Sequence, residues 1–165
     1  EFDVAAEKWT GRFWKYKLEV NGNNIGDFNM IDGSTGLIIE RDNGEGDPAK
    51  ACEGTPKHDC FNVAAKFKRV YKIGLGAANA NGFARKIAHI DLMDIEDPKK
   101  LARRGAANGK LTFPFVTIEN VDVVEGEHIV VGNDNNFPFS SGREIGRQDD
   151  NELILLHVPD FLKAK

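Results

Sequence analysis

The pattern of apolar and polar positions repeats once along the chain. Residues 27–44 (DFNMIDGSTGLIIERDNG) align without a gap on residues 119–136 (ENVDVVEGEHIVVGNDNN), at an offset of 92 positions. In this overlay Leu37–Ile39 falls on Ile129–Val131, and each apolar run is followed by a cluster of Asn and Asp. Each copy therefore predicts a strand, a tight turn and a second strand that ends in turn-forming residues.

A further apolar run follows each copy after a loop, at residues 69–73 and 152–156. Repeated antiparallel strands separated by turn signals are typical of propeller blades. We therefore predict an all-β fold: a partial β-propeller with about two four-stranded antiparallel blades, over about residues 27–95 and 119–158. A strand at 12–20 would belong to a preceding blade. Residues 1–165 would form the C-terminal part of a single propeller domain.

Other segments carry weaker structural signals. Residues 86–95 alternate well enough for a fourth, outermost strand, and Pro98 suits the first turn of a short helix over 97–104. Residues 158–162 are expected to end the last strand. Two Phe-Pro-Phe units supply aromatic side chains that we expect to act as packing anchors; they are Phe113, Phe115, Phe137 and Phe139.

Antiparallel geometry predicts which polar residues share a face. In an up-and-down blade, the loop after the second strand lies at the end where the first strand starts. Asp27 and Glu119, at strand starts, should therefore lie near 41–43 and 133–136. The same face would carry further charged residues, namely Glu45, Asp47, Arg143, Arg147, Asp149 and Asp150.

This polar face has two interpretations. Ca²⁺ takes six to eight oxygen ligands from carboxylates, amides and carbonyls, which makes a metal site possible, with candidate ligands Asp42, Asn133, Asp134 and Asp149. The arginines could pair with a phosphate or with those carboxylates. Alternatively, Asn and Asp after a strand are what ordinary turns prefer.

Composition and cysteine spacing narrow the class of protein. The net charge of −4 disfavours nucleic-acid binding, and no apolar run has the roughly 18 residues that a membrane helix needs. Cys52 and Cys60 do not have the spacing of common zinc or thioredoxin-like sites. We interpret them as a disulfide that pins a surface loop, outside the reducing cytosol; a metal or redox pair is the alternative. Ser140 and Ser141 lack the nucleophile-elbow motif.

Several blocks resemble a known family. IGDFNMIDGSTGLIIERDNGEGD, KFKRVYKIGL, FPFVTIENVDVV, VVGNDNNFPFSSGR and DDNELILLHVP are similar to the C-terminal part of the phytase-like proteins. These bacterial, usually exported proteins are also described as having esterase-like activity and are expected to be β-propellers. Members are longer, so the resemblance implies that this chain is a C-terminal fragment whose partner is the remaining N-terminal segment of the same propeller.

The resemblance implies a secreted or periplasmic phosphoesterase, with Ca²⁺ as cofactor and a small phosphate ester or anion as ligand. We expect Glu119, Arg41 and Arg143 to be catalytic, the arginines neutralising charge on the phosphoryl oxygens. The alternative is a non-catalytic propeller that binds a ligand or partner and holds structural calcium. Fold resemblance alone does not carry activity.

Overall fold

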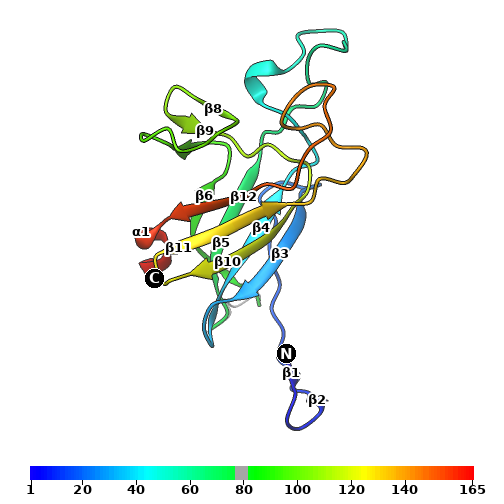
Figure 1. The fold of residues 1–165 in the computed structure, drawn as a ribbon. Coiled ribbons are helices and arrows are strands. Elements are labelled where there is room, and N and C mark those ends of the chain that lie inside the picture. Colours follow the sequence, from blue (N-terminus) through cyan, green and yellow to red (C-terminus); the bar gives the residue numbers. More distant parts are fainter. Residues whose placement is uncertain (77–81) are drawn as a thin grey trace.

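Two antiparallel sheets packed face to face form the body of the protein (Figure 1). The structure is a computed structural model, and it describes residues 1–76 and 82–165. The first sheet has the order β3-β4-β5-β6 and the second the order β10-β11-β12. Their strands are β3 (Asn24–Met30), β4 (Thr35–Arg41), β5 (Lys68–Gly74), β6 (Arg85–Asp91), β10 (Ile118–Val124), β11 (His128–Asn133) and β12 (Leu153–His157).

Short elements occupy the connections between these strands. A small sheet of order β7-β9-β8 lies between β6 and β10 in the chain, and a β1-β2 hairpin projects from the body at the N-terminus (Figure 1). The elements are β1 (Phe2–Asp3), β2 (Lys8–Trp9), the 3-10 helix η1 (Pro48–Lys50), β7 (Ile95–Glu96), β8 (Ala106–Ala107), β9 (Lys110–Leu111) and α1 (Pro159–Lys163). No helix in the described residues has the length and apolar character that a membrane crossing requires.

The two copies of the sequence repeat form the same structural unit. The hairpins β3-β4 and β10-β11 begin the two sheets, and each has a β-bulge in its first strand, between Ile25 and Phe28 and between Ile118 and Asn120. The overlay of 27–44 on 119–136 places the two bulges at the same position of the repeat. Open antiparallel sheets of this kind confirm the all-β fold built from partial propeller blades. The second sheet has three strands in the described residues, one fewer than expected.

The core lies between the sheets. Leu37 and Ile39 of β4 alternate with residues of the opposite face, and they pack with Val121, Ile129 and Val131 of the second sheet; all are essentially inaccessible to solvent. The sheets approach closely at Gly26, where a Cβ atom would lie 1.9 Å from the carbonyl oxygen of Ile118. Only glycine fits there.

The last residues of the chain belong to this core. The expected strand end at 158–162 is wrong, because Pro159 starts the helix α1 instead. Phe161 of this helix is buried between the sheets. The buried Lys72 of β5 donates hydrogen bonds to the carbonyl oxygens of Leu162, at 2.5 Å, and Ala164, at 3.0 Å. Lys72 thereby satisfies carbonyls that the end of a helix leaves without partners.

The expected helix at 97–104 does not form. Asp97 is buried, and its carboxylate accepts hydrogen bonds from the backbone N–H groups of Leu101, at 2.7 Å, and Ala102, at 3.1 Å. Lys100 adopts a left-handed backbone conformation with φ of 54°, which interrupts a right-handed helix. Local hydrogen bonding by the aspartate thus replaces the helix with a loop.

The expected strand at 12–20 is also absent. This segment makes one isolated bridge, between Lys15 and Phe83, and then lies on the outer face of the first sheet. There Tyr16 packs against Ile38 and Tyr71. Tyr16 serves this packing, whereas Phe13 is 71% exposed.

The aromatic anchors are confirmed for one Phe-Pro-Phe unit. Phe113 and Phe115 are buried, with their ring centroids 4.8 Å apart in an edge-to-face arrangement. Phe137 and Phe139 are 71% and 85% exposed, so the expectation that they anchor the core is wrong. They lie in the loop after β11, beyond the edge of the inter-sheet core.

Candidate functional site

The expected polar face exists at one end of the two sheets, which we call the rim. The start of β3 pairs with the end of β4 through Asn24 and Arg41, and the start of β10 pairs with the end of β11 through Ile118 and Asn133. The loops 42–67 and 134–152 extend from this end and lie next to each other (Figure 1). The strand geometry therefore brings the expected site residues of both repeats to one region.

Asp42 is held by a buried ion pair in the first of these loops. Its Oδ1 lies 2.8 Å from Nζ of Lys68, whose side chain is completely buried. Lys68 also donates to the carbonyl oxygens of Asp42, at 2.9 Å, and Gly44, at 2.8 Å. The other carboxylate oxygen accepts from the N–H groups of Lys66 and Phe67. Burial lowers the pKa of Lys68, and the contact with Asp42 opposes that shift.

Asp149 is similarly engaged in the second loop. Its buried carboxylate accepts hydrogen bonds from the backbone N–H groups of Gly142, at 2.7 Å, and Arg143, at 2.9 Å. Burial raises the pKa of Asp149, although these hydrogen bonds oppose the shift.

Arg143 is buried beside it. Its guanidinium makes a bidentate pair with Glu152, at 3.0 and 2.8 Å, and donates to the carbonyl oxygen of Thr112. It also lies over the ring of Phe115. A contact of Arg143 with a phosphate would require breaking this pair.

The Asn133–Asn136 cluster forms a turn at the end of β11. The buried Asn133 accepts from the N–H of Glu152, at 2.6 Å, and donates to the carbonyl oxygen of Asp150. Asp134 is exposed, and its Oδ1 accepts from the N–H of Asn136 at 2.9 Å, as an Asx-turn does. Turn chemistry thus accounts for the local bonds of this cluster, whereas Asn133 ties it to the segment that leads into β12.

Asp27 and Glu119, at equivalent bulges, have different surroundings. The carboxylate of Asp27 accepts from the N–H of Val121 at 2.9 Å and from the amide of Asn29 at 3.1 Å. Asn29 in turn donates to the carbonyl oxygen of Val121 at 2.6 Å. Asp27 therefore joins the two sheets. Glu119 is exposed, and its side chain makes no hydrogen bond or ion pair within the described residues.

Arg41 is a rim cation with a buried donor that has no partner among the described residues. Its Nη1 donates to Oδ1 of Asn43 at 2.8 Å, and the same oxygen accepts from Asn24. The Nε of Arg41 is buried and has no hydrogen-bond partner in the part of the chain that the structure describes. An arginine donor left in this state costs free energy.

Glu45 is a rim residue whose environment the sequence did not specify. Its half-buried carboxylate lies near Ser140, Ser141 and Asp149 of the other rim loop. Burial raises the pKa of Glu45 and the nearby Asp149 adds to the shift, while Ser140, Ser141 and Lys68 oppose it. Glu45 therefore lies where the two rim loops meet.

The expected calcium ligands do not form a prepared cage. In the described residues, no group of three or more His, Cys, Asp or Glu side chains is arranged to hold a metal. The carboxylate oxygens of Asp42 and Asp149, and the amide oxygen of Asn133, already accept hydrogen bonds from the protein. Exposed carboxylates at Glu119 and Asp134 are the ones that would have to supply a site.

A second buried charge cluster lies on the outer face of the first sheet, away from the rim. Glu40 is completely buried and accepts hydrogen bonds from Tyr16, Asn23, Lys86 and the N–H of Glu19, at 2.7 to 2.9 Å. Burial acts to raise the pKa of Glu40, but these hydrogen bonds lower it overall. Alternation along β4 placed Glu40 opposite Leu37 and Ile39, which predicts only a polar outer face.

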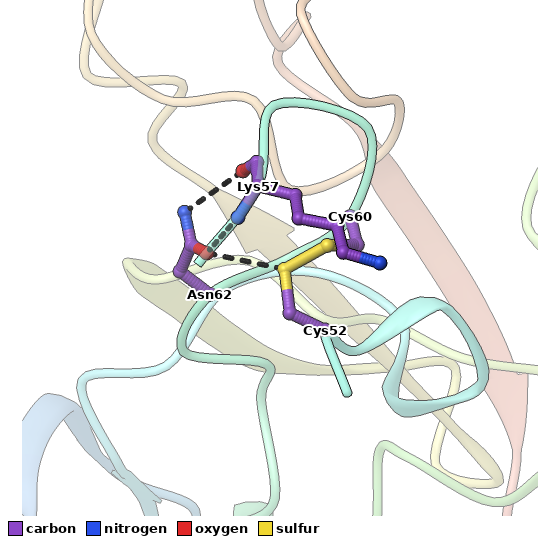
Figure 2. The surroundings of a disulfide bond; sticks show 4 residues. All are labelled: Cys52, Lys57, Cys60 and Asn62. Carbon is purple, nitrogen blue, oxygen red and sulfur yellow. Dashed lines mark hydrogen bonds between the residues drawn. A yellow bond between two sulfur atoms is a disulfide. The ribbon is translucent and has the colours of Figure 1, made fainter. Parts of the chain in front are cut away.

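Cys52 and Cys60 form the expected disulfide, with Cα atoms 4.9 Å apart (Figure 2). Asn62 organises the enclosed loop: its side chain accepts from the N–H of Lys57 at 3.1 Å and donates to its carbonyl oxygen at 3.3 Å. Its Oδ1 also lies 3.1 Å from the Cys52 sulfur. A disulfide is compatible with an extracytoplasmic location.

Comparison with known proteins gives a family match. The sequence profile of the phytase-like family, described as "esterase-like activity of phytase", matches residues 1–137. This span includes the first sheet, the small sheet and the β10-β11 hairpin. No curated protein and no solved structure gives a significant match.

Proposed function

Because the chain belongs to the phytase-like family, we propose that it is part of an exported hydrolase that cleaves phosphate monoesters at the rim. The family description indicates esterase-like activity of the phytase type. We further propose that its substrates are phosphate esters, that it is exported and that it requires Ca²⁺. We also propose that a further segment of the same propeller completes the ring, since propellers close with about four to eight blades.

The unused donor of Arg41 is the observation that carries the proposal. A buried guanidinium nitrogen without a partner is costly, whereas a phosphate oxygen accepts charge-assisted hydrogen bonds from arginine in the geometry that this side chain favours. Asn43 holds Nη1, and Nη2 makes no hydrogen bond among the described residues. A phosphate would therefore meet Nη2 first and would reach the enclosed Nε only after neighbouring groups move.

The other rim residues have separate roles in the proposal. Glu119 would act as general base on the attacking water, because it is an exposed carboxylate on the same end of the sheets. Glu119 takes a proton from water as the water oxygen bonds to phosphorus, and the bond from phosphorus to the ester oxygen breaks. The leaving oxygen takes a proton from solvent and departs as the alcohol, and Glu119 returns its proton to solvent. Asp42 with Lys68, and Asp149 with Arg143, hold the two loops in place.

Calcium enters the proposal as a requirement to be tested. Bound near Glu119 and Asp134, it would neutralise charge on the phosphate. Chelation followed by titration with Ca²⁺ tests this directly. Activity that is lost with the chelator and restored by the metal would support the requirement, and activity that persists would remove it.

The enzymatic proposal is tested by hydrolysis of p-nitrophenyl phosphate. Arg41→Met and Glu119→Gln should each lower kcat/KM about 10²- to 10³-fold, the usual effect of losing one group that stabilises developing charge. Arg147→Met is the matched control, since this exposed rim arginine pairs only with Glu144. Circular dichroism checks the fold of each variant.

A protein inert toward phosphate and carboxylate esters would instead support a non-catalytic binding module. The many rim oxygens already used in internal hydrogen bonds favour this second candidate. Calorimetric titration with inorganic phosphate separates the two outcomes: binding that depends on Arg41 without turnover would indicate a binding module.

A further inference from the structure

Strand β12 presents an unpaired backbone edge. It is the last strand of the second sheet, and among the described residues it pairs with β11 alone. The hydrogen bonds from Asn133 to Glu152 and from Val158 to Glu127 show which residues face β11. Because antiparallel pairs alternate between hydrogen-bonded and non-hydrogen-bonded positions, the N–H and C=O groups of Leu153, Leu155 and His157 point outward from the sheet.

This edge is one wall of a groove. The groove has a volume of about 1020 Å³ and runs along residues 150–158, and its opposite wall is the segment 94–104. Ile95, Leu111 and Ile154 give it an apolar lining. The groove therefore lies directly beside the unpaired edge of β12.

The internal repeat indicates what belongs in this groove. The first sheet continues past β5, the equivalent of β12, with the antiparallel strand β6. Ala88 and Ile90 of β6 alternate along the strand and pack into the core between the sheets. The corresponding place beside β12 is the groove.

The charged side chains of the groove set a second requirement for the segment that it binds. The acidic residues lining the groove are already neutralised or hydrogen-bonded: Asp94 and Glu96 pair with Lys110, and Asp150 pairs with Arg104. Lys99 and Arg103 also line the groove, are exposed, and make no ion pair within the described part of the chain. A carboxylate on the bound segment would pair with one of these two cations.

We propose that the groove along β12 binds one extended peptide segment, antiparallel to β12, with apolar residues at alternate positions and at least one carboxylate. The segment adds a fourth strand to the second sheet by β-augmentation. Its backbone pairs with Leu153, Leu155 and His157, and its apolar side chains cover the groove lining. This surface is separate from the rim and does not depend on the proposed hydrolysis.

The test uses a fluorescein-labelled peptide that copies residues 84–92 (ARKIAHIDL), the segment in the equivalent place of the first sheet. Fluorescence anisotropy should show saturable binding to the chain. Leu155→Pro should weaken binding at least tenfold, because proline removes an outward N–H that only the added strand uses. Leu155→Ala keeps that N–H and is the matched control. A peptide with Asp91→Asn should also bind more weakly, because it lacks the carboxylate that would pair with Lys99 or Arg103.

Hydrogen exchange gives a readout that does not depend on a variant. Bound peptide should slow exchange of the amides of Leu153, Leu155 and His157, and leave those of Ile154 and Leu156 unchanged. Absence of saturable binding, or binding without this alternating protection, would overturn the proposal, even if Leu155→Pro failed to fold. Concentration-dependent dimerisation that Leu155→Pro abolishes would also overturn it, in favour of a second copy at this edge.

Discussion

Lys68 offers the sharpest test of how the rim is held together. Lys68→Met keeps most of the buried volume and removes the ammonium group, which contacts the carboxylate and carbonyl of Asp42 and the carbonyl of Gly44. The variant leaves a carboxylate without its cation and two carbonyl oxygens without this donor. Removing one partner of a buried ion pair typically costs about 3–5 kcal/mol, and we expect a loss of unfolding free energy in that range.

The assay is urea unfolding followed by circular dichroism. With a slope of about 2 kcal/mol/M, such a loss lowers the urea midpoint by roughly 1.5–2.5 M. Lys66→Met is the matched control: Lys66 is exposed, its side chain makes no ion pair among the described residues, and its substitution should change stability by about 0.5 kcal/mol or less. A loss below about 1 kcal/mol in Lys68→Met would refute the reasoning, because the pair would then contribute no more than a surface pair.

Three further changes test other parts of the fold. Glu40→Gln should make the free energy of unfolding fall less steeply as the pH is lowered. The pKa of Glu40 is lowered in the fold, so the stability that its carboxylate contributes is present above the usual pKa of a glutamate and is lost as pH falls through the lowered value. Urea midpoints measured from pH 7 to pH 3 will show the difference. Gly26→Ala should cost about 1–3 kcal/mol by urea unfolding, because its Cβ would collide with β10, whereas Gly33→Ala meets no atom within 4 Å and should be nearly neutral. Replacing Cys52 and Cys60 by Ser should cost about 2–3 kcal/mol by the loop-entropy relation, measured against the oxidised wild type, and a stability equal to that of the wild type would contradict this estimate.

Much of the architecture could be predicted from the sequence, because side chains alternate along strands and the repeat is ungapped. The overlay of Asp27 on Glu119 predicted two hairpins with a common direction and located the rim. It did not reveal that Asp27 bonds to Val121 while Glu119 stays exposed. That difference arises because the bulge of β3 faces the second sheet, and sequence periodicity does not indicate how the two sheets are placed.

The buried lysines show why the site was harder to predict than the sheets. Lys68 and Lys72 share one face of β5 with the buried Val70, and alternation alone would place charged residues on a solvated face. Their acceptors come from residues 42–44 and 162–164, far away in the chain. Burial of a charge depends on such distant partners, so it becomes visible only when the fold brings them together.

The contact between Lys72 and α1 has a consequence for how the protein opens. The helix follows the last strand of the second sheet, yet its carbonyl oxygens are bound by a lysine of the first sheet, and Phe161 lies between the two. Separating the sheets would expose the ring of Phe161 and break the hydrogen bonds of the Lys72 ammonium group. The two sheets should therefore open as one cooperative unit, with their slowest-exchanging amides reporting a common free energy.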